Sequence, residues 1–372
     1  MSKFDEKNLV IMEKYRRTLE LQQLGPLTIN GYFWKLYTAL NHLKLKPADE
    51  VTKEDIQDFI IFRRNNNKQR TVNGDIIALK KFFNWLKPGN DLFEDIKVKR
   101  QKPYLPVSQL LSTDDVKSML SVCKRQRDRA WLMVLWDTGC RLNEILSRNI
   151  NDIQFDDYGA TLTVDGKTGM RKLRLIDSLP DLRQWLNQHP LKNTPGAPLF
   201  VTERRYDKNE SKILTEKRLD HNTIQNSLKT LGKLAGVTKN VHAHAFRHAR
   251  LTQYVKQGFM ESELRHIAGW TRSSAMVDTY IHLSGGDVDK KILRTNGLIK
   301  DQEEFILKSL KPGKCPRCAT DNSVDAKYCS ICGLILDQNV AKDIDEKTKS
   351  IPGLLAALQH DPEFLKLLTK HL

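Results

Sequence analysis

The stretch Val241-His-Ala-His-Ala-Phe-Arg-His248 is the segment around which the rest of the chain can be interpreted. It places His244 and Arg247 three residues apart, and on a helix this spacing puts both side chains on one face. Such a pair can approach one phosphate group from one side, because arginine is a permanent cation with a fork of donors and histidine is a titratable donor. A helix end with unrelated histidines fits the stretch equally well. The interpretation therefore depends on partners elsewhere in the chain.

Composition places the chain among basic globular proteins. Its 372 residues are enough for about two or three domains. The longest apolar run, residues 130–136, is far shorter than the ~20 residues of a membrane span. The charged N-terminus lacks a secretory signal, so we expect a cytoplasmic, nucleoid-associated protein without membrane contact. A net charge of +16 favours a polyanionic partner, most simply nucleic acid, although a merely soluble basic protein shares this property.

The first part of the chain is predicted to be helical throughout residues 1–95. Helical spacing of apolar residues recurs there, and Thr52 followed by Asp55 is typical of a capping box. Lysine and arginine gather on the second pair of predicted helices, which favours a DNA-clamping domain, with a solvated face as the alternative for each single residue. Residues 96–111 are basic, contain two prolines and lack periodicity, so they predict a linker.

A second domain is predicted to begin at Ser112. Helical patterns there give way to alternation with period two at residues 153–155, 160–164 and 172–176, with a turn at 166–169. Residues 190–213 predict a loop, and helical patterns then resume up to Tyr280. The expected fold class is mainly α with a small antiparallel β-sheet (α+β).

Other residues that can contact or react with a phosphate lie before and after the stretch 241–248 in the sequence. Arg141 follows a Thr-Gly-Cys turn, Lys167 lies at the predicted hairpin tip, and Gly269-Trp270 precedes Tyr280. This order resembles the tyrosine recombinase family of phage-type integrases and Xer-like resolvases, and the ending Tyr280–Asp289 looks most like archaeal members. The resemblance covers roughly residues 1–295. It implies a helical core-binding domain at 1–95, the linker at 96–111 and a catalytic domain at 112–300.

The resemblance implies a role for each residue. Arg141 and Arg247 would bind the non-bridging oxygens of the scissile phosphate. Tyr280 would attack the phosphorus and leave a 3′-phosphotyrosyl link with a free 5′-hydroxyl. Lys167 would protonate the departing 5′-oxygen, and His244 would assist as an acid or base.

Two further residues complete the implied set. Glu144 would orient Arg141 without reacting. Trp270 occupies a position that is often histidine in the family, and its indole N–H can donate to a phosphate but cannot transfer a proton. Because the phosphodiester bond energy is kept in the covalent link, no cofactor is needed for catalysis, and the sequence lacks the glycine spacing of a P-loop.

For several residues a purely structural role, or another residue in the same catalytic role, is the alternative. Lys167 alone is typical of a hydrophilic turn, and Arg171 or Lys172 is the alternative contact. His248 is interpreted as a structural histidine, and His266 as a helix residue outside the catalytic set.

The six cysteines fall into two groups. Cys123 and Cys140 lie in apolar helical context and predict plain buried thiols. The other four have the spacing C-x2-C-x10-C-x2-C, which resembles a zinc ribbon over residues 312–336 with structural zinc. Redox pairs and iron are weaker alternatives. The ligands would be Cys315, Cys318, Cys329 and Cys332. Within the tail, 337–372, the apolar residues from Ile351 to Leu368 predict two short amphipathic helices around Asp361-Pro362.

The function expected from the resemblance is site-specific DNA recombination. The partners would be double-stranded DNA, further copies forming a synaptic tetramer, and an accessory directionality factor. Integration or excision of a mobile element is the first hypothesis, and chromosome-dimer resolution of the Xer type is the second. Relaxation of DNA as in type IB topoisomerases, and non-catalytic DNA binding on the same scaffold, are the alternatives.

Overall fold

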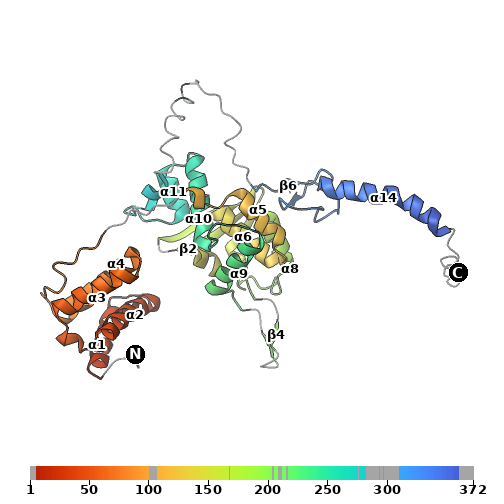
Figure 1. The fold of residues 1–372 in the computed structure, drawn as a ribbon. Helices are drawn as coiled ribbons and strands as arrows, with labels where there is room; N and C mark the ends of the chain where they lie inside the picture. Colours follow the sequence, from red (N-terminus) through yellow and green to blue (C-terminus); the bar gives the residue numbers. More distant parts are fainter. Residues whose placement is uncertain are drawn as a thin grey trace. The chain divides into compact units, whose positions relative to one another are not determined.

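Helices dominate both units of the chain (Figure 1). The computed structural model describes residues 6–99, 107–166, 168–202, 205–207, 212–214, 217–274, 276–281, 293, 296 and 310–359. The chain divides into two compact units, residues 1–103 and 104–372. Small antiparallel sheets occur in the second unit. The predicted fold class, mainly α with a small antiparallel sheet, is confirmed.

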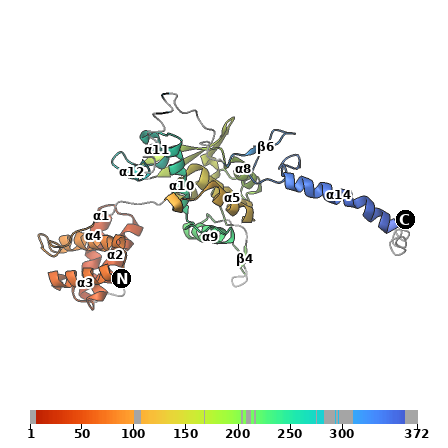
Figure 2. The same ribbon diagram turned by 45° about the horizontal axis from the view of Figure 1, so that its top comes forward.

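The first unit is a group of four helices around an apolar core (Figure 2). Buried aromatic side chains fill this core, and Tyr15 meets Phe82 edge to face at 5.0 Å between ring centroids. The predicted capping box is confirmed: the Thr52 hydroxyl accepts from the Asp55 amide, and the Asp55 carboxylate accepts from the Thr52 amide. The helices are α1 (Glu6–Leu21), α2 (Pro26–His42), α3 (Lys53–Asn66) and α4 (Gln69–Leu86), with a 3-10 turn at Ala48–Glu50.

The start of the predicted linker follows the first unit closely. The side chain of Asn73 donates to the Lys99 carbonyl at 2.7 Å, and Arg64 donates to the Lys97 carbonyl at 3.4 Å. The boundary between the two units falls inside the stretch that the sequence assigns to a linker. Residues 100–106 lie outside the described part of the chain.

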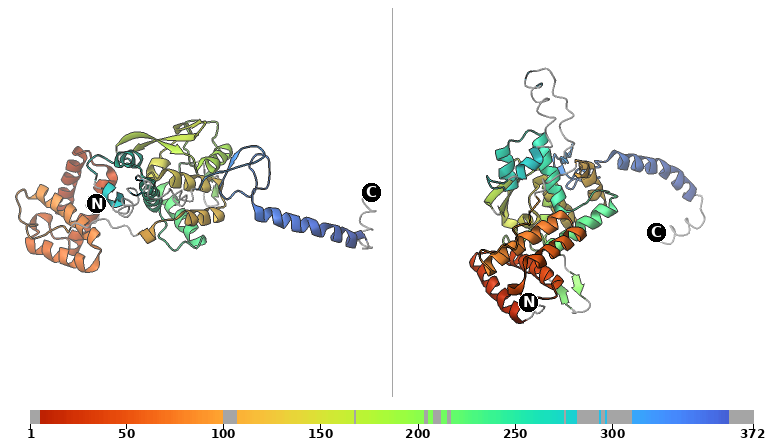
Figure 3. Two further views of the ribbon diagram at one scale, coloured as in Figure 1. Left: turned by 90° about the horizontal axis from the view of Figure 1, so that it is seen from above. Right: turned by 60° about the vertical axis from the view of Figure 1, so that its left-hand side comes forward.

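The second unit is built on helix α6 (Gln126–Thr138), in which every residue from Ala130 to Thr138 is buried. Helices surround it, and a three-stranded antiparallel sheet lies along one side of this helical body (Figure 3). The elements before the sheet are a 3-10 turn (Val107–Gln109), α5 (Thr113–Val122), α7 (Leu142–Leu146) and a second 3-10 turn (Ile150–Asp152). The later ones are α8 (Leu179–Gln188), α9 (His221–Leu234), α10 (Ala243–Lys256), α11 (Glu261–Ala268) and α12 (Met276–Ile281).

The sheet confirms the predicted alternation. Strands β1 (Ile153–Asp156), β2 (Gly159–Gly166) and β3 (Gly169–Leu175) pair in that order, and Leu162 lies opposite both Ile153 and Leu173. Leu162 and Val164 of β2 and Leu173 and Leu175 of β3 face the core, because alternate side chains of a strand point to the same side, whereas Phe155 of β1 and Met170 of β3 are exposed.

One predicted loop was wrong. Residues 190–213 contain β4 (Arg205–Asp207), which pairs antiparallel with β5 (Lys212–Leu214). Each strand has only three residues, Arg-Tyr-Asp in β4 and Lys-Ile-Leu in β5. The period-two alternation that reveals a half-buried strand is therefore missing from the sequence.

The C-terminal part returns to the second unit. Leu310 is fully buried in the core of that unit, and Val324 packs against the same core. Short strands β6 (Gly313–Lys314) and β7 (Asp321–Asn322) form a hairpin between them.

The helix of the tail begins earlier than predicted. α14 runs from Gln338 to Gln359 as one helix. It begins at Gln338 because the Asp337 side chain accepts hydrogen bonds from the backbone amides of Asn339 and Val340. The prediction began at Ile351 because it followed the apolar residues alone. The second predicted helix, beyond Asp361-Pro362, lies outside the described residues.

Candidate active site

Helix α10 (Ala243–Lys256) contains most of the stretch 241–248, including His244, Arg247 and His248. Its first turn is capped by His242, whose Nδ1 accepts from the Ala245 amide at 3.2 Å. Arg247 points into the protein and is 2% exposed. Its Nη1 donates to the Gly139 carbonyl at 3.2 Å and its Nη2 to the Ala268 carbonyl at 2.7 Å. Two buried carbonyls therefore fix the guanidinium.

Arg141 approaches the same place from the start of α7. Gly139 makes this turn possible, because its φ is +58° and a Cβ there would lie 2.9 Å from the Arg250 side chain. The Nη groups of Arg141 donate to the carbonyl oxygen of Gly269 at 3.3 Å. The Arg141 side chain remains 33% exposed. It is the accessible member of the predicted arginine pair.

Glu144 holds Arg141, as the resemblance implies, and also pairs with a second arginine. Its carboxylate accepts from the Arg141 amide at 3.0 Å and from Arg141 Nη1 at 2.9 Å. It also accepts from Arg171 Nη2 at 2.7 Å. Burial opposes ionisation of Glu144, but the hydrogen bonds from Arg171 and Arg141 outweigh it and lower its pKa.

The cations of this site outnumber its carboxylate. Arg141 and Arg171 share Glu144, whereas Arg247 pairs with no carboxylate within the described part of the chain. Burial and the neighbouring Arg141 lower the pKa of Arg247 to about 10, so it is still a cation at neutral pH. A buried cation without a counter-ion is costly. The site is therefore suited to bind an anion such as a phosphodiester.

Tyr280 on α12 lies inside the same site and is 1% exposed. Its hydroxyl oxygen is 2.6 Å from His248 Nδ1. The centroid of the Tyr280 ring is 5.4 Å from that of the Trp270 ring. The Arg247 guanidinium carbon is also 5.4 Å from the centroid of the Trp270 ring. Burial raises the pKa of Tyr280 to about 12, against the influence of Arg247. The phenol is therefore protonated in this state.

His248 is the partner that the sequence interpretation missed. Burial first, and then the charges of His244, Arg247 and His242, lower its pKa to about 4. At neutral pH its ring is uncharged, and in the tautomer that carries the proton on Nε2, Nδ1 accepts the hydrogen bond from the Tyr280 hydroxyl. One signal was available in the sequence: His248 is four residues after His244, on the same helix face, and the two rings meet at 4.6 Å.

Other predicted residues border this site. Trp270 follows Gly269, which ends α11 with φ of +60°. A cavity of about 300 Å³ opens beside it, and His266 lines this cavity from α11. Lys167 lies outside the described residues. Its neighbours Gly166 and Gly169 face each other at the end of the β2–β3 ladder.

The described residues of the site group around one end of α11. Contacts of α10 with α6, α11 and α12, and of α11 with β3, bring these segments together (Figure 2), and Arg141 lies 128 residues before the Gly269 carbonyl to which it donates. The structure thus gathers Arg141, Glu144, Arg247, His248, Trp270 and Tyr280, and the His244 ring lies against His248.

An acid titration tests the environment of His248. Between pH 6.5 and 4 the unfolded chain binds a proton at this histidine, whereas the folded protein does not. Stability from the neutral ring is present above pH 6.5 and is lost as pH falls towards 4. We expect the free energy of unfolding of His248→Gln to fall less steeply over this window than that of the wild type. His221→Gln, on the exposed start of α9, is the matched control. Equal slopes for wild type and His248→Gln would contradict the assignment.

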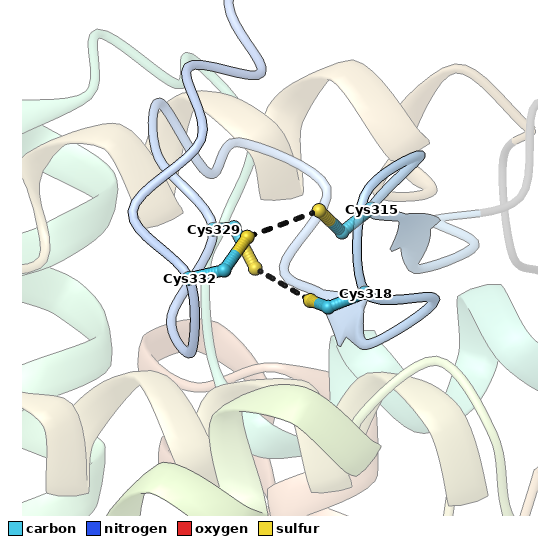
Figure 4. A group of neighbouring side chains, drawn as sticks. All are labelled: Cys315, Cys318, Cys329 and Cys332. Atoms are coloured by element: carbon cyan, nitrogen blue, oxygen red, sulfur yellow. Dashed lines mark hydrogen bonds between the residues drawn. The ribbon is translucent and has the colours of Figure 1, made fainter.

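The four clustered cysteines form a second candidate site (Figure 4). Their Sγ atoms lie within 4.8 Å of one another, and the pairs Cys315–Cys332 and Cys318–Cys329 are each 3.5 Å apart. All four are free thiols. Sulfurs around a tetrahedral zinc ion, at about 2.3 Å from the metal, are about 3.8 Å apart. The donor set and spacing therefore fit a metal ion.

Comparison with known proteins places the chain in a family. Residues 109–285 match the phage integrase family, and residues 12–89 match the phage integrase N-terminal SAM-like domain. The tyrosine recombinase XerC of Alcanivorax borkumensis is 26% identical over 276 residues, which are 70% of this chain and 85% of XerC. The tyrosine recombinase XerA of Pyrococcus furiosus is 26% identical over 290 residues, which are 77% of this chain and 94% of XerA.

Solved structures share the fold. XerH recombinase bound to its difH substrate in a pre-cleavage complex has a TM-score of 0.54 at 20% identity, over 76% of this chain and 82% of that one. A lambda integrase dimer bound to a COC′ core site has a TM-score of 0.56 at 16% identity, over 74% of this chain and 77% of that one.

The chain belongs to the phage integrase family of tyrosine recombinases. Membership supports DNA cleavage and rejoining as its activity and site-specific recombination as its general function. The cysteine cluster lies beyond residue 285, where the family match ends. No helix in the described part of the chain is both long and apolar enough to span a membrane.

Proposed function

We propose that the described site performs the DNA strand cleavage of this recombinase with Tyr280 as the nucleophile. The observation that supports this most strongly is the position of the Tyr280 hydroxyl. It is 2.6 Å from a neutral histidine, in a site where the buried Arg247 has no carboxylate partner among the described residues. The Tyr280 oxygen bonds to phosphorus, the bond from phosphorus to the 5′-oxygen breaks, and that oxygen takes up a proton and leaves as a 5′-hydroxyl. Because this is a transesterification, the step needs no metal or nucleotide.

The proposed roles follow from the contacts. Arg141 and Arg247 bind the non-bridging oxygens, and the indole N–H of Trp270 adds a neutral donor. Glu144 orients Arg141. Lys167 is the proposed acid for the 5′-oxygen, with assistance from His244.

We add His248 to this set as the acceptor for the Tyr280 proton. The pKa values of about 12 for Tyr280 and about 4 for His248 keep the proton on the tyrosine in the DNA-free protein. Ionisation of the phenol therefore accompanies its attack on phosphorus, when the negative charge passes to oxygens bound by the arginines. Tyr280 and His248 belong to one chain, which supports cleavage in cis.

We propose integration or excision of a mobile element as the biological reaction, on DNA of the nucleoid, by a synaptic tetramer with an accessory directionality factor. The dimeric and tetrameric complexes of lambda integrase with DNA support multimerisation. Resolution of chromosome dimers is the second candidate, favoured by the near full-length alignments with XerC and XerA. Topoisomerase-like relaxation and non-catalytic binding remain as further outcomes of the test.

The test uses source DNA fragments in buffer without metal or ATP. We expect denaturant-resistant protein–DNA adducts at a defined site, and joint molecules only when two copies of that site are present. Relaxation of supercoiled plasmids that carry one site or none would instead indicate a topoisomerase. Tight binding without adducts on any fragment would contradict the proposal and favour a non-catalytic binder.

We further propose that the cysteine cluster holds a structural zinc ion. All four positions of a tetrahedral site are then filled by protein, so this metal has no part in strand cleavage. The surrounding module is attached to the catalytic unit by Arg129, which donates to Asp325 at 2.9 Å and to Asp181 at 2.9 Å. Ser323 also donates to Asp181. We infer that the contacts of Arg129 and Asp181 with Asp325 and Ser323 anchor the cysteine module on α6 and α8.

Loss of two ligands tests the metal proposal. We expect Cys318→Ser combined with Cys332→Ser to abolish bound zinc in elemental analysis and to raise amide hydrogen exchange in residues 313–336. The melting temperature should fall by about 5 °C, the shift that roughly 2 kcal/mol produces in a unit of this size. Cys123→Ser, outside the cluster, is the control. Purified wild-type protein without bound metal would contradict the proposal.

A further inference from the structure

Arg171 lies at the centre of the site but has no place in the chemistry described above. It projects from β3 and is 6% exposed. Its Nη2 donates to Glu144 at 2.7 Å, its Nη1 donates to the same carboxylate at 3.4 Å, and its Nε donates to the Ile267 carbonyl at 3.0 Å. Each nitrogen of the guanidinium therefore has a protein partner, in contrast to the partly exposed Arg141.

Arg171 and Arg141 are linked through one carboxylate. Glu144 accepts from Arg171 with both oxygens and from Arg141 with both oxygens. The Glu144 side chain is 5% exposed, so it lies behind Arg141 and not on the surface that DNA would meet. A change in Arg171 must therefore alter the position of the carboxylate that orients Arg141.

The C-terminal end of α11 provides a second link. The last carbonyls of a helix have no partners within the helix and carry its negative dipole end. Here three consecutive carbonyls accept from three arginines: Ile267 from Arg171, Ala268 from Arg247, and Gly269 from Arg141. The helix end that precedes Trp270 is thus a common support for both proposed phosphate-binding arginines.

Two glycines leave room for this arrangement. A Cβ on Gly269 would lie 2.6 Å from Arg171 Nη1, and a Cβ on Gly166 would lie 2.6 Å from a Glu144 oxygen. Gly166 is also the residue before Lys167. The Arg171–Glu144 pair therefore lies in space that a side chain at position 166 or 269 would fill. The pair also lies next to the tip of the β2–β3 hairpin.

We propose that Arg171 is a positioning residue for strand cleavage, which fixes Arg141 through Glu144 and through the C-terminal end of α11. This inference rests on the proposed function of the site. All three guanidinium nitrogens of Arg171 bond to protein groups and the residue is 6% exposed, so we place it behind Arg141 and assign it no direct contact with the phosphate. Its effect is on the rate of cleavage and not on the affinity for DNA.

Arg171→Lys is the principal test variant, because lysine keeps the charge but cannot bond to Glu144 with two nitrogens and to Ile267 at once. We expect single-turnover cleavage of DNA to slow by about 10- to 100-fold, the effect of a misplaced group in an active site. The dissociation constant for DNA should stay within twofold of the wild type. Arg174→Lys, an exposed arginine of the same strand that pairs with Asp156, is the matched control.

A double-mutant cycle tests the route through Glu144. If Arg171 acts in part through this carboxylate, Arg171→Lys combined with Glu144→Gln should slow cleavage by less than the product of the two single effects. Multiplying effects would overturn the proposal. Glu144→Gln also provides an independent variant of the same link if Arg171→Lys folds poorly.

A modified DNA substrate distinguishes an effect of Arg171 on Arg141 from an effect of Arg171 on proton donation by Lys167. With sulfur in place of the bridging 5′-oxygen, the thiolate leaves without a proton, so the defect of Lys167→Ala should disappear. The defect of Arg171→Lys should persist, because Arg141 binds non-bridging oxygens. Its disappearance would overturn the proposal. If the wild type cleaves no DNA, the proposed function fails; if it cleaves and Arg171→Lys matches Arg174→Lys, only this inference fails.

Discussion

Tyr280→Phe is expected to abolish covalent protein–DNA adducts while leaving DNA binding intact. The substitution removes only the hydroxyl, which is the proposed attacking group, and no other atom of the side chain can bond to phosphorus. Among the described residues the hydroxyl has one hydrogen bond, to His248 Nδ1, and loss of this bond costs about 1 kcal/mol of stability. Gel analysis under denaturing conditions measures the adducts, and a binding titration measures the affinity.

Tyr254→Phe is the matched control for this variant. Tyr254 is a part-buried tyrosine on α10 whose hydroxyl donates to the Asp137 carbonyl at 3.3 Å, away from His248. We expect its adducts to form at the wild-type rate within a few fold. Adducts that survive Tyr280→Phe but disappear with Tyr254→Phe would contradict the assignment of the nucleophile.

Arg247→Lys is expected to have the second largest effect. Lysine keeps the positive charge but cannot bond to the Gly139 and Ala268 carbonyls and still present a fork to the phosphate. We expect the cleavage rate to fall by about 10³-fold, at the upper end of what the loss of one transition-state donor costs. Single-turnover cleavage measures this rate.

The control for Arg247 lies on the same helix. Lys256→Gln removes a charge from the exposed end of α10 and should leave the cleavage step unchanged. Cleavage by Arg247→Lys at the wild-type rate would show that the buried guanidinium serves the fold and not the phosphate.

Much of the fold was predictable because the patterns were regular. The capping box at Thr52 and the alternation in β2 and β3 are local signals, and the structure confirms them. The β4–β5 hairpin and the start of α14 were missed because one lacks alternation and the other depends on a polar cap at Asp337.

The site was harder to predict because its contacts join distant segments. The His248–Tyr280 hydrogen bond spans 32 residues, and no spacing rule reveals which histidine of the stretch faces the phenol. Glu144 was expected to orient Arg141, and the structure places it there, but the second bond to Arg171 depends on how β3 packs on α11. Lys167, whose place is outside the described residues, stays a prediction.

The most direct test of the central claim is to identify the amino acid that is linked to DNA. Digestion of the adduct with trypsin and nuclease, followed by mass spectrometry, should find the peptide Ser273–Lys290 with a nucleotide on Tyr280. The 3′-phosphate of that nucleotide should form the link, and the other DNA end should carry a free 5′-hydroxyl. A nucleotide on any other residue, or a link through a 5′-phosphate, would contradict the account.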